Sequence, residues 1–479
     1  MAGGAELVVV SNRGPYSMQE GADGSFRAVR GGGGLAPSLA AALEARGQGG
    51  VAEDDAPTNP VWVAAARSAG DRRVAQTAQP TGNGVGLSVH FVDLDDDTAR
   101  AAYDVVANST LWFLFHGLFD ASRRPVFDRV WYEAWEAFRR YNVAFAEMAA
   151  EAAAPSATVL VNDYHLLLAG ARLRSLRPDL RSVHFSHTPF SAPGELEMLP
   201  AAVRREILTS MASFGACGFH TARWEDAFRR SAESDLGTAP PTFHAGLGAD
   251  VDRLAATSSS PGVSERLARL EELLGGRRLI LRSDRVELSK NLLRGFRAFE
   301  AMLEENPGWR DRVVMLARAY SSRESLPEYL AYRAEVEHAA RLVNERFGTG
   351  SWRPVVMEVE DDFASTVAAF RRYDVLLVNP VRDGMNLVAK EGPSLNERGG
   401  VLVLSELAGA YEELEDDVLG VNPFDVRATS QALLSALEMP EAERRRRAAA
   451  LAAKAALRGP AGWLEVVLDK AVCPRAVPG

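Results

Sequence analysis

The chain has 479 residues, of which 47% are hydrophobic and 25% are charged, and its formal net charge is −10. This composition is typical of a globular protein of two or three domains, and the acidic balance argues against binding to nucleic acid or to an anionic membrane. Two cysteines exclude a disulfide framework, and the lack of an 18-residue apolar stretch or a signal peptide predicts a cytoplasmic protein without a membrane span.

Short, uninterrupted apolar runs recur along the chain, with helical patterns between them. The runs form two sets, residues 7–10, 158–161 and 182–185, and residues 279–281, 313–316, 355–357, 375–378 and 401–404. Continuous apolar strands are buried on both faces, and with helices between them they form parallel sheets. Helices are predicted at residues 35–46, 129–153, 291–305, 328–347 and 427–457. Two sets of strands therefore predict two doubly wound α/β domains.

A polar segment of small residues at 246–262 predicts the junction between these domains. We expect an N-terminal domain at 1–255, a C-terminal domain at 256–457, and a final segment at 458–479 that packs back on the N-terminal domain. Ligands of doubly wound domains bind beyond the carboxyl ends of the parallel strands. The functional side chains are therefore sought at those strand ends.

The first strand ends in Ser11-Asn12-Arg13, and a glycine run at 31–34 precedes the first helix. Glycine lets backbone N–H groups approach an anion, and a helix N-terminus adds partial positive charge. The run does not match the P-loop pattern, which argues against an ATPase or kinase of that class. A flexible turn is the structural alternative for the glycines.

Polar residues follow the next two buried strands. Asp163 and His165 end one strand, and His184 and His187 end the other. The mouth of a parallel sheet is where functional side chains gather. A metal site formed by the two strand histidines is disfavoured, because positions i and i+3 of a strand face opposite sides. The alternative for each histidine is a polar group that is satisfied at a strand end.

Two cations, Arg285 and Lys290, follow the first strand of the second set. Lysine as a point charge and arginine as a fork can together hold a diphosphate. A surface ion pair with Asp284 or Glu287 is the alternative.

A specific string, RDGMNLVAKE at 382–391, follows the strand at 375–378 and leads into a helix. Gly384 allows a tight turn, and the amides after it are free donors at a helix start. Asp383 can accept a hydrogen bond from a sugar hydroxyl, and Glu391 can accept two from a ribose. A purely structural N-terminal cap is the alternative for Asp383.

Together these motifs resemble the trehalose-6-phosphate synthase family of retaining GT-B glycosyltransferases, in its actinobacterial form. The shared motifs run in the family's order over nearly the whole chain: SNR, the glycine run, NSTLW at 108–112, DYH at 163–165, HTPF at 187–190, DRVELSK at 284–290, RDGMNLVAKE and VLVLSELAGA at 401–410. The resemblance implies two Rossmann-like domains facing across a cleft, with the nucleotide-sugar donor on the C-terminal one and glucose-6-phosphate on the N-terminal one. It also implies no metal and no cofactor.

The resemblance further implies a role for each matching residue. Arg285, Lys290, His187 and Asp163 would be the catalytic residues, with the two cations on the donor diphosphate and His187 on a hydroxyl of the transferred glucose. The donor would also be held by Gly33, Gly34, Asp383, Gly384, Met385, Asn386, Leu387 and Glu391. The acceptor would be held by Arg13, Tyr103 and Arg323 at its phosphate and by Trp112 and Asp163 at its sugar.

The function expected from this resemblance is transfer of glucose from UDP-, GDP- or ADP-glucose to glucose-6-phosphate, which gives trehalose 6-phosphate. One alternative is a pseudo-glycosyltransferase that couples a nucleotide-activated cyclitol to an aminocyclitol phosphate, and another is a glycerol-phosphate acceptor. A non-catalytic sugar-phosphate sensor is the alternative from another class. The partners are therefore the two substrates, with no nucleic acid or membrane, and a homo-oligomer is left open.

Overall fold

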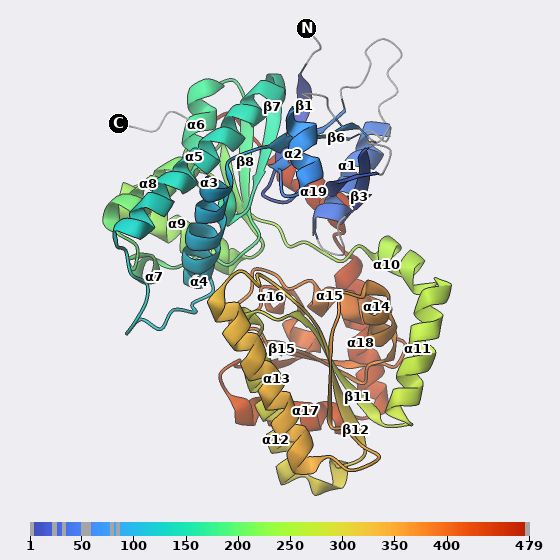
Figure 1. Cartoon of the computed structure of the whole chain (residues 1–479). Coiled ribbons are helices and arrows are strands. Elements are labelled where there is room, and N and C mark those ends of the chain that lie inside the picture. The colour runs from blue at the N-terminus through green and yellow to red at the C-terminus, as the bar shows by residue number, and fades with distance from the viewer. Residues whose placement is uncertain are drawn as a thin grey trace. The chain divides into compact units, whose positions relative to one another are not determined.

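The computed structural model describes residues 4–21, 26–30, 35–48, 59–76, 81–82 and 87–474. The chain forms two compact units, unit 1 (Met1–Gly246 with Pro460–Gly479) and unit 2 (Leu247–Gly459), both drawn in Figure 1. Residues 247–255, which the sequence assigned to the N-terminal domain, belong to unit 2, because Leu254 packs there against Val263 and Val367. Among the described helices, none combines the length and the apolar character that crossing a membrane requires.

The described part of unit 1 contains an eight-stranded sheet that is parallel except for β5. The strand order β10-β9-β8-β7-β1-β4-β6-β5 means that the chain builds outward from β1 on one side and then from β7 on the other. This doubly wound order creates a switch point between β1 and β7. The strands are β1 (Ala5–Val10), β4 (Val61–Ala65), β5 (Thr81–Gly82), β6 (Ser88–Val92), β7 (Ala153–Asn162), β8 (Arg181–Ser186), β9 (Ala216–Phe219) and β10 (Thr242–His244), beside a hairpin of β2 (Tyr16–Glu20) and β3 (Phe26–Arg30).

The helices of unit 1 surround this sheet. They are α1 (Leu35–Gln48), α2 (Ala69–Gln76), α3 (Asp96–Arg100), the π-helix η1 (Ala101–Leu111), α4 (Trp112–Phe115), α5 (Arg129–Ala152), the 3₁₀ turn η2 (Tyr164–Leu166), α6 (Ala169–Leu176), α7 (Pro193–Leu196), α8 (Ala201–Met211), α9 (Ala222–Leu236) and α19 (Pro460–Asp469). The aromatic side chains of α5 are part of the core, since Trp135, Phe138 and Phe145 are at most 1% exposed. The helix begins at Asp128, whose side chain accepts from the backbone N–H of Trp131.

The chain returns to unit 1 through α19, near its C-terminus. The Trp463 side chain is fully buried and donates to the Ala245 carbonyl oxygen at 3.2 Å, while its ring lies 4.7 Å from that of Phe185. Beyond the helix, the Ser182 N–H donates to the Val472 carbonyl oxygen at 3.0 Å. These contacts join α19 and the segment after it to β8.

All of unit 2 lies within the described residues, and its six-stranded sheet is parallel throughout. The order β13-β12-β11-β14-β15-β16 is again doubly wound, with the switch point between β11 and β14. Each predicted strand of the second set is present, and the sequence missed only β16. The strands are β11 (Arg278–Arg285), β12 (Val313–Tyr320), β13 (Val355–Val359), β14 (Val375–Val378), β15 (Val401–Ser405) and β16 (Leu419–Val421). The prediction of two doubly wound α/β domains is therefore confirmed.

Two predictions about the helices of unit 2 are corrected by the structure. The expected linker contains α10, which Asp250 caps by accepting from the Arg253 N–H. The single helix expected at 427–457 is two helices, because Pro440 has no N–H and restricts the residue before it. The helices are α10 (Val251–Ser258), α11 (Pro261–Leu274), η3 (Leu288–Lys290), α12 (Leu292–Glu305), η4 (Pro307–Trp309), α13 (Pro327–Phe347), α14 (Phe363–Arg372), α15 (Val388–Leu395), α16 (Tyr411–Leu414), η5 (Glu415–Asp417), α17 (Val426–Glu438) and α18 (Glu441–Ala456).

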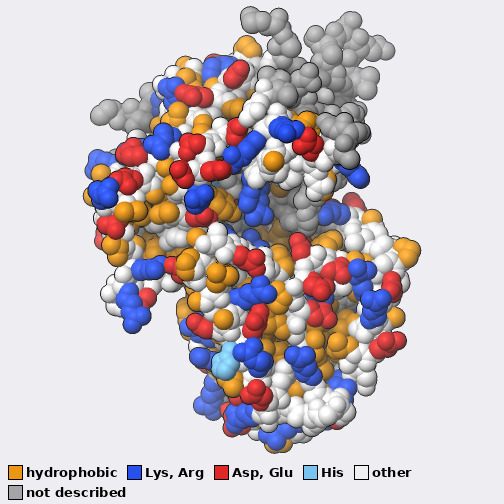
Figure 2. All heavy atoms as spheres, viewed as in Figure 1, with side chains coloured by type: hydrophobic (Ala, Val, Ile, Leu, Met, Phe, Trp, Pro, Cys, Tyr) orange, Lys and Arg blue, Asp and Glu red, His pale blue; other side chains and the backbone are white. Residues whose placement is uncertain are grey.

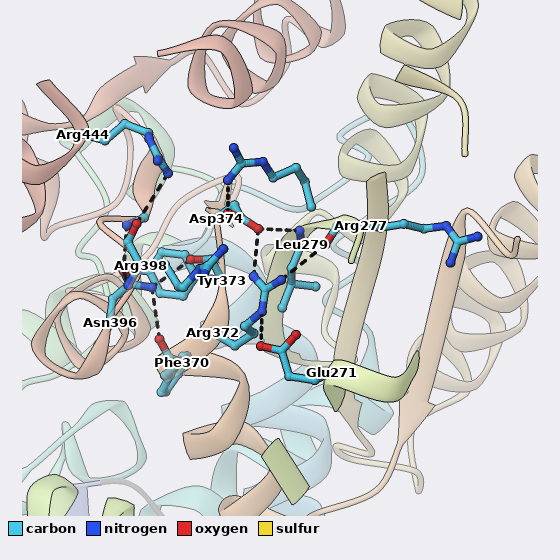
Figure 3. A network of polar contacts seen from close by, with 12 residues as sticks. Glu271, Arg277, Leu279, Phe370, Arg372, Tyr373, Asp374, Asn396, Arg398 and Arg444 are labelled. Atoms are coloured by element: carbon cyan, nitrogen blue, oxygen red, sulfur yellow. Dashed lines mark hydrogen bonds and ion pairs between the residues drawn. The ribbon is translucent and has the colours of Figure 1, made fainter. Parts of the chain in front are cut away.

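A buried polar network joins α11, α14 and β11 at the amino end of the unit 2 sheet (Figure 3). Asp374 precedes β14 and accepts from the Leu279 N–H at 2.9 Å and from Arg372 Nη1 at 3.0 Å. Arg372 Nε donates to Glu271 at 2.6 Å. Because Asp374 and Arg372 are only 2% and 5% exposed, this pair is structural, and it lies at the end of the sheet opposite the predicted site.

The surface carries charges of both signs. On the face seen in Figure 2, Lys and Arg side chains are interspersed with Asp and Glu side chains over both units. Many of them pair within one helix or between neighbouring helices, as Arg346 does with Glu300 at 2.9 Å. Exposed pairs of this kind contribute little to stability.

Candidate active site

The switch point of unit 2 brings together the loops that follow β11 and β14. The Val381 N–H donates to the Ser289 carbonyl oxygen at 2.7 Å, which joins the loop after β14 to the η3 turn after β11. Asn291 extends this junction by donating through Nδ2 to the carbonyl oxygens of Asn379 and Pro423 at 2.9 and 2.8 Å. The RVELSK and RDGMNLVAKE motifs, which lie about 90 residues apart in the sequence, are therefore neighbours in the fold.

Lys290 and Asp383 form an ion pair at this junction. The Lys290 Nζ atom lies 2.5 Å from Asp383 Oδ2, and the two side chains are 15% and 14% exposed. Burial lowers the pKa of Lys290, but the carboxylates of Asp383 and Glu287 outweigh burial, so the pKa is raised overall. Lys290 is therefore a charged ammonium group with further N–H donors available for an anion.

Glu287 is the centre of a cluster of charged side chains. From the sequence, it was considered only as the partner of a possible surface ion pair. Its carboxylate is 1% exposed and lies 3.1 Å from Arg285 Nη1 and 3.5 Å from Arg323 Nη1, and it accepts from Ser322 Oγ at 2.8 Å. Burial opposes the charged form, but the charges of Arg285, Arg323 and Lys290 lower the pKa of Glu287 to about 2. The alternative ion pair between Arg285 and Glu287 is therefore present, but it is not a surface pair, because the Glu287 side chain is buried.

These charges leave the strand ends of unit 2 with a net positive character. Arg285, Lys290 and Arg323 carry three positive charges against the two negative charges of Glu287 and Asp383. The Arg285 side chain remains 41% exposed, whereas Arg323 is 9% exposed and its guanidinium lies 5.4 Å from the Tyr329 ring centroid. An anion that reaches this cluster would meet Arg285 and Lys290 first.

The loop after β14 is held in one conformation by the segment after β15. The Asp383 N–H donates to the Leu407 carbonyl oxygen, and the Gly409 N–H donates to the Asp383 carbonyl oxygen, both at 3.1 Å. A Cβ atom at Gly409 would lie 1.9 Å from the Gly384 carbonyl oxygen, so only glycine fits there. Asn386 has a φ of +74° and donates through Nδ2 to Asp383 Oδ2 at 3.1 Å. The predicted donor residues from Asp383 to Leu387, including Met385, thus form one braced turn.

Glu391 lies in the first turn of α15, beyond this loop. Burial raises the pKa of its carboxyl to about 7, with the nearby charge of Asp250 acting in the same direction and that of Arg253 against it. Near neutral pH the group is present in both protonation states. It can therefore both donate to and accept from a pair of hydroxyls.

The switch point of unit 1 gathers a different set of groups. Asn162, the last residue of β7, donates through Nδ2 to the Val10 carbonyl oxygen at 3.2 Å. Asp163 follows with φ +72° and ψ 171°, a backbone conformation that side-chain-bearing residues rarely adopt. The His187 N–H donates to Asp163 Oδ1 at 3.2 Å. Strain of this kind, about 1–3 kcal/mol per residue, is concentrated at functional sites.

Both ring nitrogens of His187 are engaged within unit 1. Nε2 lies 3.0 Å from Asn162 Oδ1, and Nδ1 lies 3.1 Å from His220 Nε2. Burial lowers the pKa of His187 well below its usual value, and the nearby His220 and His184 lower it further, so the ring is neutral. Because the Asn162 amide nitrogen is used by Val10, its oxygen faces His187 and must receive a proton from Nε2. Nδ1 is then unprotonated and faces His220 Nε2, while His220 Nδ1 lies 3.4 Å from the Ala245 carbonyl oxygen. Asn162 therefore sets the tautomer of His187.

The predicted acceptor residues of unit 1 differ in their exposure. Arg13 is exposed, whereas Trp112 is 3% exposed and packs against the rings of Phe113 and His116. Tyr103, on the π-helix η1, stacks on the His165 ring at a centroid distance of 5.6 Å.

The structure distributes the predicted site residues between the two units. It brings Arg285, Lys290 and Asp383 together, and it brings Asp163 and His187 together. Arg323 lies in unit 2, while the other predicted ligands of the acceptor phosphate lie in unit 1. The remaining predicted donor residues, Gly33 and Gly34, lie outside the described residues. In the part of the chain that the structure describes, no three His, Cys, Asp or Glu side chains are grouped as a metal site.

A family model for glycosyltransferase family 20 matches residues 5–472. The chain belongs to this family. The family predicted from the motifs is thereby confirmed, and the protein is a glycosyltransferase.

Curated relatives agree with this assignment. The glycosyltransferase is 31% identical to a trehalose-6-phosphate synthase of Mycobacterium sp. (strain JLS), over 98% of this chain and 96% of that one, in keeping with the predicted actinobacterial type. It is 34% identical to a bifunctional trehalose-6-phosphate synthase/phosphatase of Thermoproteus tenax, over 79% of this chain. It spans about half (52%) of that relative's length.

Solved structures share the fold over nearly the whole glycosyltransferase. An alpha,alpha-trehalose-phosphate synthase (UDP-forming) of Burkholderia xenovorans, in complex with glucose-6-phosphate, has a TM-score of 0.82 and 28% identity, with 97% of this chain and 99% of that chain covered. The E. coli protein bound with UDP-2-fluoro glucose has a TM-score of 0.83 and 28% identity, with 98% and 100% covered.

Two residues of the site were not assigned a role from the sequence. His220 follows β9, a four-residue strand without an uninterrupted apolar run, so its position at a strand end was not visible. Glu287 lies between the two predicted cations in the sequence, two residues after Arg285 and three before Lys290. This position close to both cations could have indicated its role. Both contact predicted residues: His220 lies beside Nδ1 of His187, and Glu287 pairs with the cations of the cluster.

Proposed function

We propose that this glycosyltransferase moves glucose from a nucleoside-diphosphate-glucose to the anomeric hydroxyl of glucose-6-phosphate with retention of the α configuration. The products are trehalose 6-phosphate and a nucleoside diphosphate. The observation that carries the proposal is the pair of cations, Arg285 and Lys290, at the switch point of unit 2. The relatives support it, since one bears the name trehalose-6-phosphate synthase and one solved structure holds glucose-6-phosphate.

The donor binds to unit 2 in this proposal. Arg285 and Lys290 hold the diphosphate, and the braced turn from Asp383 to Leu387 holds the glucose through its backbone amides and the Asp383 carboxylate. Glu391 takes the two ribose hydroxyls, a role that suits a buried carboxyl group near its pKa. The E. coli structure with UDP-2-fluoro glucose supports a nucleotide sugar of this class.

The acceptor binds to the strand ends of unit 1. Asp163 and Trp112 place the sugar, and Arg13 and Tyr103 bind the phosphate. Asp163 suits this role because its strained backbone and its hydrogen bond from the His187 N–H fix the direction of its carboxylate.

The chemistry follows from the charge that the leaving diphosphate gains as the glycosidic bond breaks. Cations already in place at that position stabilise the transition state more than the ground state. The acceptor proton passes to a diphosphate oxygen on the same face of the sugar, so no enzymic nucleophile is required. Retention of configuration then follows from attack on the face that the leaving group vacates.

The test is to incubate the protein with glucose-6-phosphate and, separately, UDP-, GDP- and ADP-glucose. We expect one or more donors to give a disaccharide phosphate by mass spectrometry and an α,α linkage by NMR. Omission of glucose-6-phosphate is the control for simple hydrolysis of the donor. Binding of both substrates without release of nucleoside diphosphate would instead indicate a sensor, and turnover with an aminocyclitol phosphate alone would indicate the pseudo-glycosyltransferase.

A further inference from the structure

An exposed arginine, Arg67, lies at the carboxyl end of β4, beside the strand end that carries Arg13. β4 pairs with β1 in parallel, and the pairing continues past the strands, since the Ala65 N–H donates to the Asn12 carbonyl oxygen at 3.3 Å. Arg13 follows Asn12, and Arg67 lies two residues after Ala65. Arg13 and Arg67, both exposed, therefore follow neighbouring strands at the same edge of the sheet.

The backbone at Arg67 is held rigidly by a buried carboxylate. Asp71, which is 1% exposed, accepts from the N–H groups of Arg67 and Ser68 at 3.0 and 2.9 Å through Oδ2, and from the Met18 N–H at 2.7 Å through Oδ1. A Cβ atom at Gly70 would lie 2.1 Å from the Met18 carbonyl oxygen. The turn that carries Arg67 is thus braced against β2, and the backbone contributes little flexibility to the position of the side chain.

The Arg67 side chain lies over one of the predicted acceptor residues. Its guanidinium carbon is 5.3 Å from the Tyr103 ring centroid, and the Tyr103 ring stacks on that of His165. Burial raises the pKa of the Tyr141 phenol, and the nearby charge of Arg67 lowers it. Tyr141 in turn donates to Asn12 Oδ1 at 2.5 Å. Arg67 is therefore close to the groups that surround the end of β1.

The charge of Arg67 is available to a ligand. No carboxylate among the described residues pairs with Arg67 or with Arg13. Arg323, the third cation predicted for the acceptor phosphate, is instead buried beside Glu287 in unit 2. A guanidinium group that is fixed over an aromatic ring and lacks an acidic partner is well suited to a phosphate, which it can hold through two N–H donors.

We propose that Arg67 is a phosphate-binding residue of the acceptor site, so that unit 1 presents two guanidinium groups, from Arg13 and Arg67, to the phosphate dianion of the acceptor sugar. This inference rests on the proposed function, and it adds a residue that selects phosphorylated over unphosphorylated acceptors. Tyr103 supports the Arg67 guanidinium from below through its ring.

The experiment compares wild type with Arg67→Gln and Arg67→Lys, and uses Arg205→Gln as the matched control, since Arg205 is exposed on α8 of the same unit. Calorimetry measures the binding of glucose-6-phosphate and of glucose, and steady-state kinetics measure KM for each substrate. We expect Arg67→Gln to weaken glucose-6-phosphate binding and raise its KM by about 10–100-fold, the effect of losing a charge-assisted contact. The kcat, the KM of the donor and the activity with unphosphorylated glucose should stay within about twofold, and Arg67→Lys should recover part of the loss.

Each outcome decides between the inference and the proposed function. Unchanged binding of glucose-6-phosphate by Arg67→Gln overturns the inference and leaves the function standing. Equal losses with glucose and with glucose-6-phosphate also overturn it, because they indicate a structural defect, which the melting temperature would report. If wild type transfers no glucose but its binding of glucose-6-phosphate depends on Arg67, the inference holds and the function fails. If wild type neither transfers glucose nor binds glucose-6-phosphate, both fail.

Discussion

Both units place polar residues at the carboxyl ends of a central pair of strands, β1 and β7 in unit 1 and β11 and β14 in unit 2. In unit 2 these residues are charged and paired, as Lys290 is with Asp383. In unit 1 the central His187 is neutral and exchanges hydrogen bonds with Asn162 and His220, and Arg13 and Arg67 lie exposed on adjacent strand ends. The same doubly wound arrangement thus presents paired charges at the strand ends of one unit and a neutral histidine beside exposed arginines in the other.

The largest effect is expected at Glu287, the buried carboxylate that distinguishes the charged site of unit 2 from the neutral group of unit 1. Glu287→Gln removes its charge. Removing one partner from a buried ion pair costs about 3–5 kcal/mol, so the free energy of unfolding should fall by that order. Urea denaturation at pH 7 measures the change, with Glu300→Gln as a surface control. A loss no larger than that of the control would mean that Glu287 does not organise the cluster.

The same residue predicts how the stability of the protein depends on pH. The pKa of Glu287 in the folded protein, about 2, is below the unfolded value. The stability that it contributes is therefore present above the unfolded pKa, near pH 4.5, and is lost as the pH falls from there towards 2. Wild type should lose more stability over this range than Glu287→Gln does, as measured by denaturation at each pH.

Lys290→Ala tests whether the charge of unit 2 serves catalysis. Loss of an electrostatic group that faces the leaving diphosphate costs about 100–1000-fold in kcat. The variant should stay folded by circular dichroism, and Lys454→Ala, which removes a lysine of the same unit that pairs with Asp417, is the control. Turnover near the wild-type rate would remove the basis for placing the diphosphate at this strand end.

His220→Phe probes the neutral network of unit 1. The change leaves the buried Nδ1 atom of His187 without its hydrogen-bond partner, which costs about 1–3 kcal/mol of stability. His220→Gln keeps an N–H donor and should retain most of the stability and the activity. The nitrogen chemical shifts of His187 report the tautomer directly. Because Asn162 holds the proton on Nε2, we expect the same tautomer in His220→Phe, and a changed tautomer would contradict the assignment.

Glu391→Gln gives the smallest expected effect. It replaces a carboxyl group that is partly charged and partly neutral near pH 7. Because burial raises its pKa to about 7, the folded protein binds a proton more tightly than the unfolded chain. Wild-type stability should therefore fall by about 1 kcal/mol between pH 6 and pH 8, and the variant should lack this fall. Parallel denaturation curves at both pH values test it, and an equal decline in both proteins would show that another group is responsible.

Uninterrupted runs such as 158–161 and 375–378 made the doubly wound class predictable, because a strand buried on both faces must be apolar at every position. Strands β9 and β10, of four and three residues, lack such runs and were missed, and with them the position of His220. The family motifs predicted Arg285, Lys290 and Asp163 as site residues, and the structure places each of them at a strand end.

By itself the sequence determined the class of the fold, the family and most of the residues at the strand ends, since periodicity and motif order are properties of the chain alone. Only the tertiary structure decided that Glu287 is buried among three cations, that both ring nitrogens of His187 are occupied, and that Arg67 lies over Tyr103. The physical reason is that charge state and availability depend on burial and on partners brought together across the sheet. Those partners come from strands that are far apart in the sequence.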